Sequence, residues 1–442
     1  MDRIVSRIEE FSRSVREHGI PKENREELKK RIADIITTSF GARNVEPVRI
    51  GIASLLPSSG SLNSTVFFTG KKASSDVAAF LNGTMTRYLD YNDTYLSKEA
   101  LHPSDNIPPL IAVAEAKDKT CGDVLNAADI SYEVVCSLSD QVSIRDRGWD
   151  HVTYISISSA AGIAHLLDLS DNKYANAINL GLNNNISMRQ TRAGELSMWK
   201  GATAANACRN SLFGSLLAMN GFSGPSPIFE GEMGFFKQVS GTFDISLDNS
   251  HVRRTMIKNF PVEYHAMSAA EASLSIRSKI EGEVESIDVE TFTVANTIII
   301  KDPEKLKPKT RETADHSMPY IIAYTLVYGE PTPDSYDGKF LNDRKILSLI
   351  EKMKFKVTKD YDKLYPENLP FKIRVKTTKG VYEEELIVPK GHFKKPYSWD
   401  DVLMKAERVM SRESAKELKE FCMSMENKDV KELIEVISNV HS

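Results

Sequence analysis

The chain has 442 residues, of which 41% are hydrophobic and 27% charged, and a formal net charge of −4 at pH 7. A single hydrophobic core seldom serves a chain of this length, so we expect two domains. The balanced charge without a basic stripe argues against a nucleic-acid partner, and no apolar run reaches the roughly 18 residues of a membrane span, which argues against a membrane partner.

The first ten residues alternate charged and apolar side chains and lack the apolar centre of a signal peptide, so we expect a cytoplasmic protein. From there to about Ala270, apolar residues recur at helical spacing. The candidate helices include residues 76–89, 110–116, 123–142, 151–169, 174–182 and 202–219. Two segments rich in Gly, Ser or Pro, 57–70 and 221–241, predict loops.

The stretch from Leu89 to Pro109, between two of these helices, is the densest run of reactive side chains. It carries Asp90, Asp93, Thr94, Lys98, Glu99, His102, Ser104, Asp105 and Asn106. A polar segment between helices is most often a solvated loop, but a titratable His among several Asp gives a functional site equal weight. Asp90 and Thr94 would share one face if the helix continued, whereas the prolines further on forbid an unbroken helix.

The composition changes after about Ile257. Four segments alternate polar and apolar residues and predict strands: 287–297, 352–358, 372–377 and 382–388. Candidate helices cover 269–280 and 320–328 among them. From Trp399 to His441 the helical pattern returns, and we expect this tail to pack back on the first domain.

The cysteines Cys121, Cys136, Cys208 and Cys422 lie far apart, with no Cys-x-x-Cys pair. This spacing does not suit a zinc ribbon or the usual ligand set of an iron–sulfur cluster. We therefore expect buried, reduced thiols, no cofactor and no metal, so that side chains must carry any chemistry.

The polar stretch resembles the signature of a known family. The residues Leu89-Asp90-Tyr91-Asn92-Asp93-Thr94, followed by His102-Pro103-Ser104-Asp105-Asn106, are similar to the MmgE/PrpD family, which includes 2-methylcitrate dehydratase and cis-aconitate decarboxylase. The form Ser-Asp-Asn after His-Pro resembles the dehydratase branch, since the decarboxylase branch more often has Gly soon after His-Pro. The resemblance implies a mainly α fold with an α+β insertion: a large all-helical domain (1–257 and 397–442), a smaller α+β lid domain (258–396), and a homodimer.

Five further segments match the family's pattern in the right order: 147–153, 195–201, 229–235, 258–265 and 313–320. The first contains His151, which the resemblance puts at a helix entrance facing the pocket, although a turn at Gly148 with Asp150 capping the next helix is the alternative. The family has site lysines at Lys200 and Lys258 and a site tyrosine at Tyr320. Lys200 also opens an Ala-rich helix beside a Trp, a place suited to a carboxylate.

The remaining matches predict supporting roles. We interpret the glycine-rich segment 229–235 as a structural turn that shapes the pocket floor, and His392 as part of another turn. The segment 258–265 lies at the expected domain boundary, where clefts form. Some decarboxylase-branch members have a His where this chain has Glu263, which weakens that alternative. Asp315 or Ser317 as a helix cap is the structural alternative to a site around His316.

The first functional hypothesis is a metal-independent dehydratase that converts 2-methylcitrate to 2-methyl-cis-aconitate, with citrate as a possible second substrate. Such a reaction needs cations to hold carboxylates, a base for the proton and an acid for the departing hydroxyl. We predict the following catalytic residues: His102 as the base, Asp90 to orient it or to bind the substrate hydroxyl, His151 and Tyr320 as candidate acids, and Lys200 as a cation. The predicted substrate-binding residues are Thr94, Lys258, Arg147, His265 and His316.

Two alternatives remain open at this stage. A cis-aconitate decarboxylase of the same fold would use the same cationic pocket, because carbanion charge develops beside carboxylates in both reactions. A helical binding protein without catalysis is the third possibility. It predicts no turnover of any tricarboxylate and tolerance of substitutions at His102 and Lys200.

Overall fold

The computed structural model describes residues 2–56, 60–61, 63–194 and 196–441. Residues 57–59 and 62 of the predicted loop, and Glu195 of the segment 195–201, lie outside the described residues. Within the part of the chain that is described, no helix is long and apolar enough to cross a bilayer.

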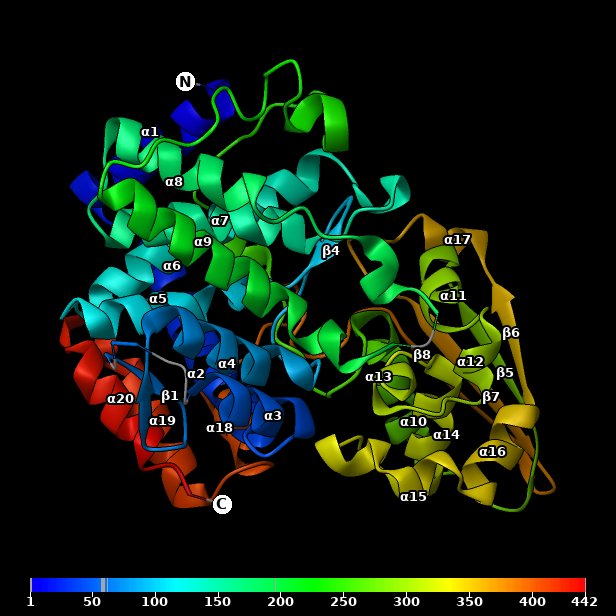
Figure 1. Ribbon diagram of the computed structural model, residues 1–442. Coiled ribbons are helices and arrows are strands. Elements are labelled where there is room, and N and C mark those ends of the chain that lie inside the picture. Colours follow the sequence, from blue (N-terminus) through cyan, green and yellow to red (C-terminus); the bar gives the residue numbers. More distant parts are fainter. Residues whose placement is uncertain (1, 57–59, 62, 195, 442) are drawn as a thin grey trace.

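The N-terminal part of the chain is helical, as predicted (Figure 1). Its helices are α1 (Arg3–His18), α2 (Lys22–Ala42), α3 (Glu46–Leu55), α4 (Ser75–Tyr88), α5 (Ile107–Ala116), α6 (Cys121–Gln141), α7 (Val152–Leu166), α8 (Asp171–Asn183) and α9 (Thr203–Met219). Two short antiparallel hairpins interrupt them: β1 (Ser64–Val66) with β2 (Lys71–Ala73), and β3 (Tyr95–Leu96) with β4 (Ala100–Leu101). Small residues allow the close contacts between α7, α8 and α9; at Gly181, for example, an added Cβ would lie 3.0 Å from Ala160 Cβ.

A mixed α+β segment follows. Its elements are α10 (Met267–Arg277), β5 (Val284–Thr291), α11 (Thr293–Ile299), α12 (Pro303–Leu306), α13 (Arg311–Ala314), α14 (Met318–Tyr328), α15 (Gly338–Leu341), α16 (Arg344–Glu351), β6 (Met353–Val357), α17 (Lys359–Asp362), β7 (Phe371–Thr377) and β8 (Gly380–Leu386). The strand order is β6-β5-β7-β8, with β5 parallel to β6 and antiparallel to β7. In β7, Phe371, Ile373 and Val375 alternate with exposed or half-buried residues and are buried in the core that contains α10.

The predicted strand over 287–297 is partly wrong. Residues 284–291 form β5, but the chain then turns into α11, although the polar–apolar alternation continues. The Asp362 carboxylate accepts hydrogen bonds from the backbone N–H and the hydroxyl of Thr293, at 2.6 and 2.8 Å. This contact satisfies a donor at the start of α11, and no local sequence pattern could predict it.

The C-terminal helices α18 (Trp399–Glu407), α19 (Arg412–Met423) and α20 (Val430–Ser438) return to the N-terminal helices. α18 and α19 pack on α2, and α20 packs on α5, so the red and blue ends of the chain meet in Figure 1. Val402, Leu418 and Leu433 belong to the same buried cluster as Ile32 and Ile35. The predicted domain limits, 257/258 and 396/397, stay a prediction, although a separate core forms around the sheet.

The two segments that join these parts run beside each other. The Ile257 N–H donates to the Gly391 carbonyl at 3.0 Å, and Gly391 has a φ of 85°. A Cβ at this position would lie 1.9 Å from the Ile257 carbonyl oxygen, so only glycine fits. Met256 and Thr94 also exchange backbone hydrogen bonds at 2.8 and 2.9 Å, which brings the crossing onto the polar stretch.

Candidate active site

The polar stretch 89–109 is not a solvated loop. α4 ends at Tyr88, so Asp90 and Thr94 do not share a helix face. Asp90 has a φ of 51°, a left-handed conformation that ends the helix, and Lys258 donates to its carbonyl at 3.0 Å. The chain then forms the β3–β4 hairpin, His102 and a 3₁₀ turn over Pro103–Asn106 before α5 begins.

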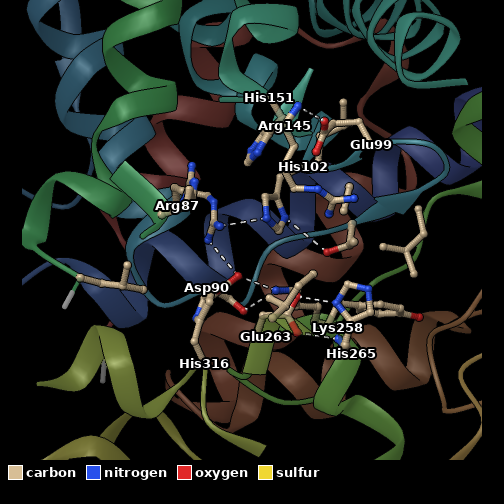
Figure 2. A pocket seen from close by; sticks show the side chains of 18 of the residues that line it. Arg87, Asp90, Glu99, His102, Arg145, His151, Lys258, Glu263, His265 and His316 are labelled. Atoms are coloured by element: carbon tan, nitrogen blue, oxygen red, sulfur yellow. Dashed lines mark hydrogen bonds and ion pairs between the residues drawn. The ribbon is translucent and has the colours of Figure 1, made fainter. Parts of the chain in front are cut away.

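This stretch forms one wall of a cavity that encloses about 700 Å³, its open mouth included. Side chains from the helical part and from the α+β part converge on it (Figure 2). The polar lining residues are Arg87, Asp90, Thr94, Glu99, His102, Arg145, His151, Arg189, Arg192, Lys258, Glu263, Tyr264, His265, Lys305 and His316. The excess of basic groups over carboxylates in this lining suits an anionic ligand.

Asp90 is the centre of the charged network. Arg87 Nη1 donates to Asp90 Oδ1 at 2.9 Å, Lys258 Nζ donates to the same oxygen at 2.5 Å, and Lys200 Nζ lies 3.4 Å from Oδ2. Burial alone would raise the pKa of Asp90, but the positive charges of Arg87, Lys258 and Lys200 outweigh it and hold the pKa well below 3.8. Asp90 is therefore a carboxylate that orders three cations.

His102 is buried beside this network. Its Nδ1 lies 2.7 Å from the Asp93 carbonyl and 3.3 Å from the Thr94 hydroxyl, whereas Arg87 Nη2 donates to its Nε2 at 2.9 Å. These partners favour the tautomer with the proton on Nδ1. Burial and then the charges of Arg87 and Lys258 lower the pKa of His102 well below 6.5, so the imidazole is neutral. In this tautomer Nε2 is the only nitrogen that can accept a proton, and it already accepts a hydrogen bond from Arg87.

His151 differs from His102 because one of its ring nitrogens has no hydrogen-bond partner among the described residues. It lies at the start of α7, as predicted, and its ring centroid is 5.9 Å from that of His102. Its Nδ1 is 3.2 Å from Asp150 Oδ1, and Nε2 has no hydrogen-bond partner among the described residues. Burial lowers the pKa of His151 to about 3, even though Asp150 opposes the shift. A neutral imidazole with an unpartnered nitrogen is a suitable proton acceptor.

Three of the predicted site residues lie outside the cavity lining: Arg147, Tyr320 and Lys200. Arg147 is exposed and donates to the Val239 carbonyl at 3.3 Å, so its predicted role in binding a carboxylate is not supported. Tyr320 is fully buried in the small core with Tyr324 and Tyr336, and its hydroxyl donates to the Ser335 carbonyl at 2.7 Å. α14 thus turns Tyr320 toward another core, which removes it as a candidate acid.

Lys200 lies behind the cavity wall. Its Nζ donates to both Asp315 oxygens at 2.9 and 3.1 Å and lies 3.1 Å from His316 Nδ1. It is 1% exposed, so its charge reaches the cavity through Asp90 and His316. Burial and then Lys200 lower the pKa of His316 to about 4, and this neutral imidazole does line the cavity.

His265 and Glu263 form a pair on the α+β side of the cavity. His265 Nδ1 is 2.7 Å from Glu263 Oε1, and its Nε2 is 3.2 Å from the Tyr365 hydroxyl. Burial would raise the pKa of Glu263, but His265 outweighs it and lowers the pKa to about 2. The cavity lining therefore includes Asp90, Thr94, His102, His151, Lys258, His265 and His316 from the sequence-based set.

The sequence analysis assigned no site role to several polar lining residues: Arg87, Glu99, Arg145, Arg189, Arg192, Glu263, Tyr264 and Lys305. Arg87 precedes Asp90 by three residues near the end of a predicted helix, and this spacing could have identified the pair. Arg189 and Arg192 lie in a short 3₁₀ turn without a periodic pattern or motif, so nothing local marked them.

Two structural interpretations can also be compared with the fold. The segment 229–235 does not line the cavity; its start is held by Asp2, whose carboxylate accepts the backbone N–H groups of residues 228–230. It is a structural turn, but it does not form the pocket floor. His392 is fully buried and its Nδ1 accepts from the Lys394 N–H at 3.1 Å, as expected for a turn. The four cysteines are buried free thiols.

One group at the wall of the cavity has the spacing of a metal site. Single ligand atoms of Asp90, Asp315 and His316 lie within 4.8 Å of one another. Lys200 already lies 3.4 Å or less from a carboxylate oxygen of each acid, and Arg87 and Lys258 bind Asp90 from other sides. Ammonium and guanidinium groups therefore take the positions in which a divalent cation would be attracted, and the donor set fits a metal poorly.

Comparisons with known proteins agree with this architecture. The model of the MmgE/PrpD N-terminal domain matches residues 6–248, and that of the MmgE/PrpD C-terminal domain matches residues 260–426. The chain is 29% identical over 344 residues to a 2-methylcitrate dehydratase of Escherichia coli K12, covering 71% of each chain. It is 28% identical over 345 residues to the mitochondrial 2-methylcitrate dehydratase of Yarrowia lipolytica (71% of this chain, 66% of the relative). It is 27% identical over 367 residues to an alkylcitrate dehydratase of a fungal species, strain ATCC 74256 (75% and 72%).

Proposed function

This chain belongs to the MmgE/PrpD family, and we propose that it is a dehydratase, a carbon–oxygen lyase that converts 2-methylcitrate to 2-methyl-cis-aconitate by side-chain chemistry alone. The names of its relatives support a dehydratase acting on an alkylated citrate. Citrate, which lacks one methyl group, is the natural second substrate to test.

One observation carries the proposal: two neutral imidazoles, His102 and His151, line a cavity whose wall also holds Arg87, Arg192 and Lys258. A substrate with three carboxylates needs several cations to bind it. The carbon–hydrogen bond next to a carboxylate is weakly acidic, and nearby cations stabilise the enolate-like charge that develops when the proton leaves. The cavity supplies both the cations and a proton acceptor.

We assign the base to His151 rather than to His102, the residue favoured by the sequence analysis. The support for this change is that His151 Nε2 is unpartnered among the described residues, whereas Arg87 already donates to His102 Nε2. His151 takes the proton from the carbon next to the hydroxyl-bearing carbon. The imidazolium so formed then protonates the departing hydroxyl, so that the products are the unsaturated tricarboxylate and water.

In this proposal the other groups hold the substrate and its developing charge. Lys258 and Arg87, anchored on Asp90, face the carboxylate next to the carbon that loses its proton. Thr94 supplies a hydroxyl on the same wall, beside His102, whose two ring nitrogens already have partners. Burial of the whole set excludes water, which strengthens each of these electrostatic contacts.

The test is incubation of the purified protein with 2-methylcitrate, citrate and cis-aconitate, with and without a chelator, followed by mass spectrometry. We expect loss of water from 2-methylcitrate, unchanged by the chelator. The His151→Gln variant, purified in the same way, controls for contaminating activity. Release of carbon dioxide from cis-aconitate would instead identify a decarboxylase, and no turnover of any of the three would contradict the proposal.

A further inference from the structure

Asp150 lies directly behind two residues of the cavity wall. It is fully buried; its Oδ1 is 3.2 Å from His151 Nδ1, and its Oδ2 accepts from Arg192 Nε at 3.0 Å. The backbone holds Asp150 in turn, because its N–H donates to the Ser187 carbonyl at 2.8 Å and its Oδ1 accepts from the Val152 N–H at 3.1 Å. One carboxylate thus contacts the side chain just before α7 and a side chain of the distant turn Arg189–Arg192.

The far ends of these two side chains are unsatisfied. Within the described residues, His151 Nε2 and Arg192 Nη2 are buried atoms without a hydrogen-bond partner. The His151 side chain is 6% exposed and that of Arg192 is 7% exposed, and both line the cavity. Buried polar atoms are nearly always paired, because an unpaired one loses its hydration without compensation. A donor and an acceptor left open in the same cavity indicate the place of a polar ligand.

The charge around this place favours an anion. Arg145 and Arg189 also line the cavity, and the described residues offer no hydrogen bond to the Arg189 guanidinium. Asp150 pairs with Arg192, and Glu99 is the carboxylate beside Arg145 and Arg189, so three guanidinium groups face two carboxylates. At the opposite side of the cavity the cation Lys258 is already paired with Asp90. The arginine side is therefore where a ligand carboxylate gains most, and guanidinium groups bind carboxylates with two parallel hydrogen bonds.

We propose that Arg192 is the specificity-determining anchor for one carboxylate of the substrate, and that Asp150 is a positioning residue that holds Arg192 and the base His151 as one unit. The inference rests on the proposed dehydratase function. A carboxylate bound at Arg192 fixes the distance of the neighbouring carbon from His151 Nε2, because the same acid orients both side chains. Substrates without that carboxylate lack this alignment.

The first experiment measures binding and needs no turnover. Isothermal titration calorimetry with tricarballylate, a tricarboxylate without the hydroxyl, is compared with glutarate, which has two carboxylates. We expect Arg192→Gln to weaken tricarballylate binding about ten- to a hundredfold, and glutarate binding much less. Arg209→Gln, which removes an exposed arginine paired with Asp76, is the matched control and should change neither. No tricarballylate binding by the wild-type protein, or equal losses for both ligands, would overturn the proposal.

The second experiment tests the coupling through Asp150. If Asp150 acts through Arg192, the binding losses of Asp150→Asn and Arg192→Gln overlap, and the double variant loses clearly less than their sum. Asp150→Asn should also lower kcat, because His151 loses its orienting partner, and Arg192→Gln should raise KM and lower kcat together, because the carboxylate that orients His151 loses its second contact. Additive losses, or unchanged tricarballylate affinity in Asp150→Asn, would refute the positioning role.

A further variant covers the case in which Asp150→Asn does not fold. Arg192→Lys keeps the positive charge but removes the planar guanidinium that can contact Asp150 and a ligand carboxylate at the same time. Both kcat and the affinity for tricarballylate should therefore fall. An unchanged kcat would overturn the coupling. Because both titrations report binding alone, they distinguish failure of this inference from failure of the dehydratase assignment.

Discussion

At the scale of single residues, the cavity contains imidazoles that stay neutral. Burial and neighbouring cations lower the pKa of His102, His151 and His316, and such histidines can take a proton but cannot be the first to give one. The carboxylate of Asp90 is ionised, because the cations that surround it lower its pKa. This separation of charged carboxylates from neutral imidazoles is typical of acid–base sites.

The histidines can be tested individually. We expect His151→Gln to lower kcat about 10²- to 10⁴-fold, the usual contribution of a positioned base. His102→Gln should also lower activity, because it removes a partner of Arg87, whereas His18→Gln, at an exposed position, should have no effect. Steady-state kinetics with circular dichroism measures this. A fully active His151→Gln enzyme would remove the base assignment.

The two site lysines should differ in what they disturb. Lys258→Met should reduce kcat/KM about tenfold or more, since a charge-assisted hydrogen bond contributes roughly 1.5–3 kcal/mol. Lys200→Met should chiefly lower the free energy of unfolding, by about 3–5 kcal/mol, because it leaves Asp315 buried without its cation. Lys356→Met, at an exposed position, is the control for both measurements. Steady-state kinetics measures kcat/KM, and urea denaturation measures the free energy of unfolding. A loss of stability in Lys258→Met with a loss of activity alone in Lys200→Met would contradict the two assigned roles.

At the scale of elements, distant parts of the chain hold the polar stretch in its unusual conformation. Lys405 on α18 donates to the Tyr91 carbonyl at 2.7 Å and pairs with Asp34 on α2, while Lys258 donates to the preceding carbonyl. Residues from both ends of the chain thus secure the peptide that follows Asp90. A left-handed aspartate persists only where its surroundings determine it in this way.

His251 connects the 3₁₀ turn His251–Arg254 to α6 and should make the stability of the fold depend on pH. It lies 2.8 Å from Glu133 and 3.1 Å from Asp140, both on α6. Burial would lower its pKa, but Asp140 and Glu133 outweigh it and raise the pKa from 6.5 to about 9. Because the folded state holds the proton more tightly, this stabilisation is complete below pH 6.5 and is lost as the pH rises through about 9. It amounts to about 3 kcal/mol.

The measurement is urea denaturation at pH 6 and pH 10. The wild-type protein should lose more stability over this interval than His251→Gln, which lacks the titrating group. The lysines and tyrosines that titrate near pH 10 are the same in both proteins, so their contribution to the loss of stability drops out of the difference. An identical loss in both would show that His251 does not carry the pH dependence.

At the scale of the whole molecule, the cavity lies where two cores meet. His102, His151 and Arg192 come from the helical part, whereas Lys258, His265 and His316 come from the segment that contains the sheet. A cavity lined by both parts can change its access through small movements at the crossing of the connecting segments.

Ligand binding should therefore protect the α+β side of the cavity. Saturating tricarballylate should slow hydrogen exchange in residues 258–265 and 313–320 and leave helices remote from the cavity, such as α19 and α20, unchanged. Exchange mass spectrometry with and without ligand measures this, and glutarate serves as the weaker-binding control. Unchanged exchange in both segments would place ligand binding within the helical part alone.

The homodimer stays a prediction. Large apolar side chains are exposed on and beside α9, at Trp199, Phe213 and Phe222, and such surfaces are often covered by a second copy. Light scattering at micromolar concentration should give about twice the 49.4 kDa of one chain. Phe213→Glu should shift the population toward the single chain, whereas Lys356→Glu, at an exposed position on β6, should not. A single-chain mass for the wild-type protein would contradict the prediction.

Local sequence patterns predicted much of the fold and part of the site. Helical periodicity identified α6 almost to its ends, and alternation identified β7, because neighbouring residues alone determine which face of such an element is apolar. The polar stretch was recognised because its side chains are adjacent in sequence. Asp90 and His151 line the cavity, and they were predicted because each belongs to a short motif of adjacent residues.

Only the tertiary structure decided which charges meet. Lys200 pairs with Asp315, more than a hundred residues away, and Arg192 reaches the cavity from a turn without any pattern. Tyr320 shows the converse: its motif suggested a site residue, but the packing of α14 turned it into another core. Periodicity describes the faces of an element, whereas the partner of a buried charge depends on how elements far apart in the chain pack together. For that reason the sequence by itself determined the elements and the chemistry available, and the fold alone selected the groups that line the cavity.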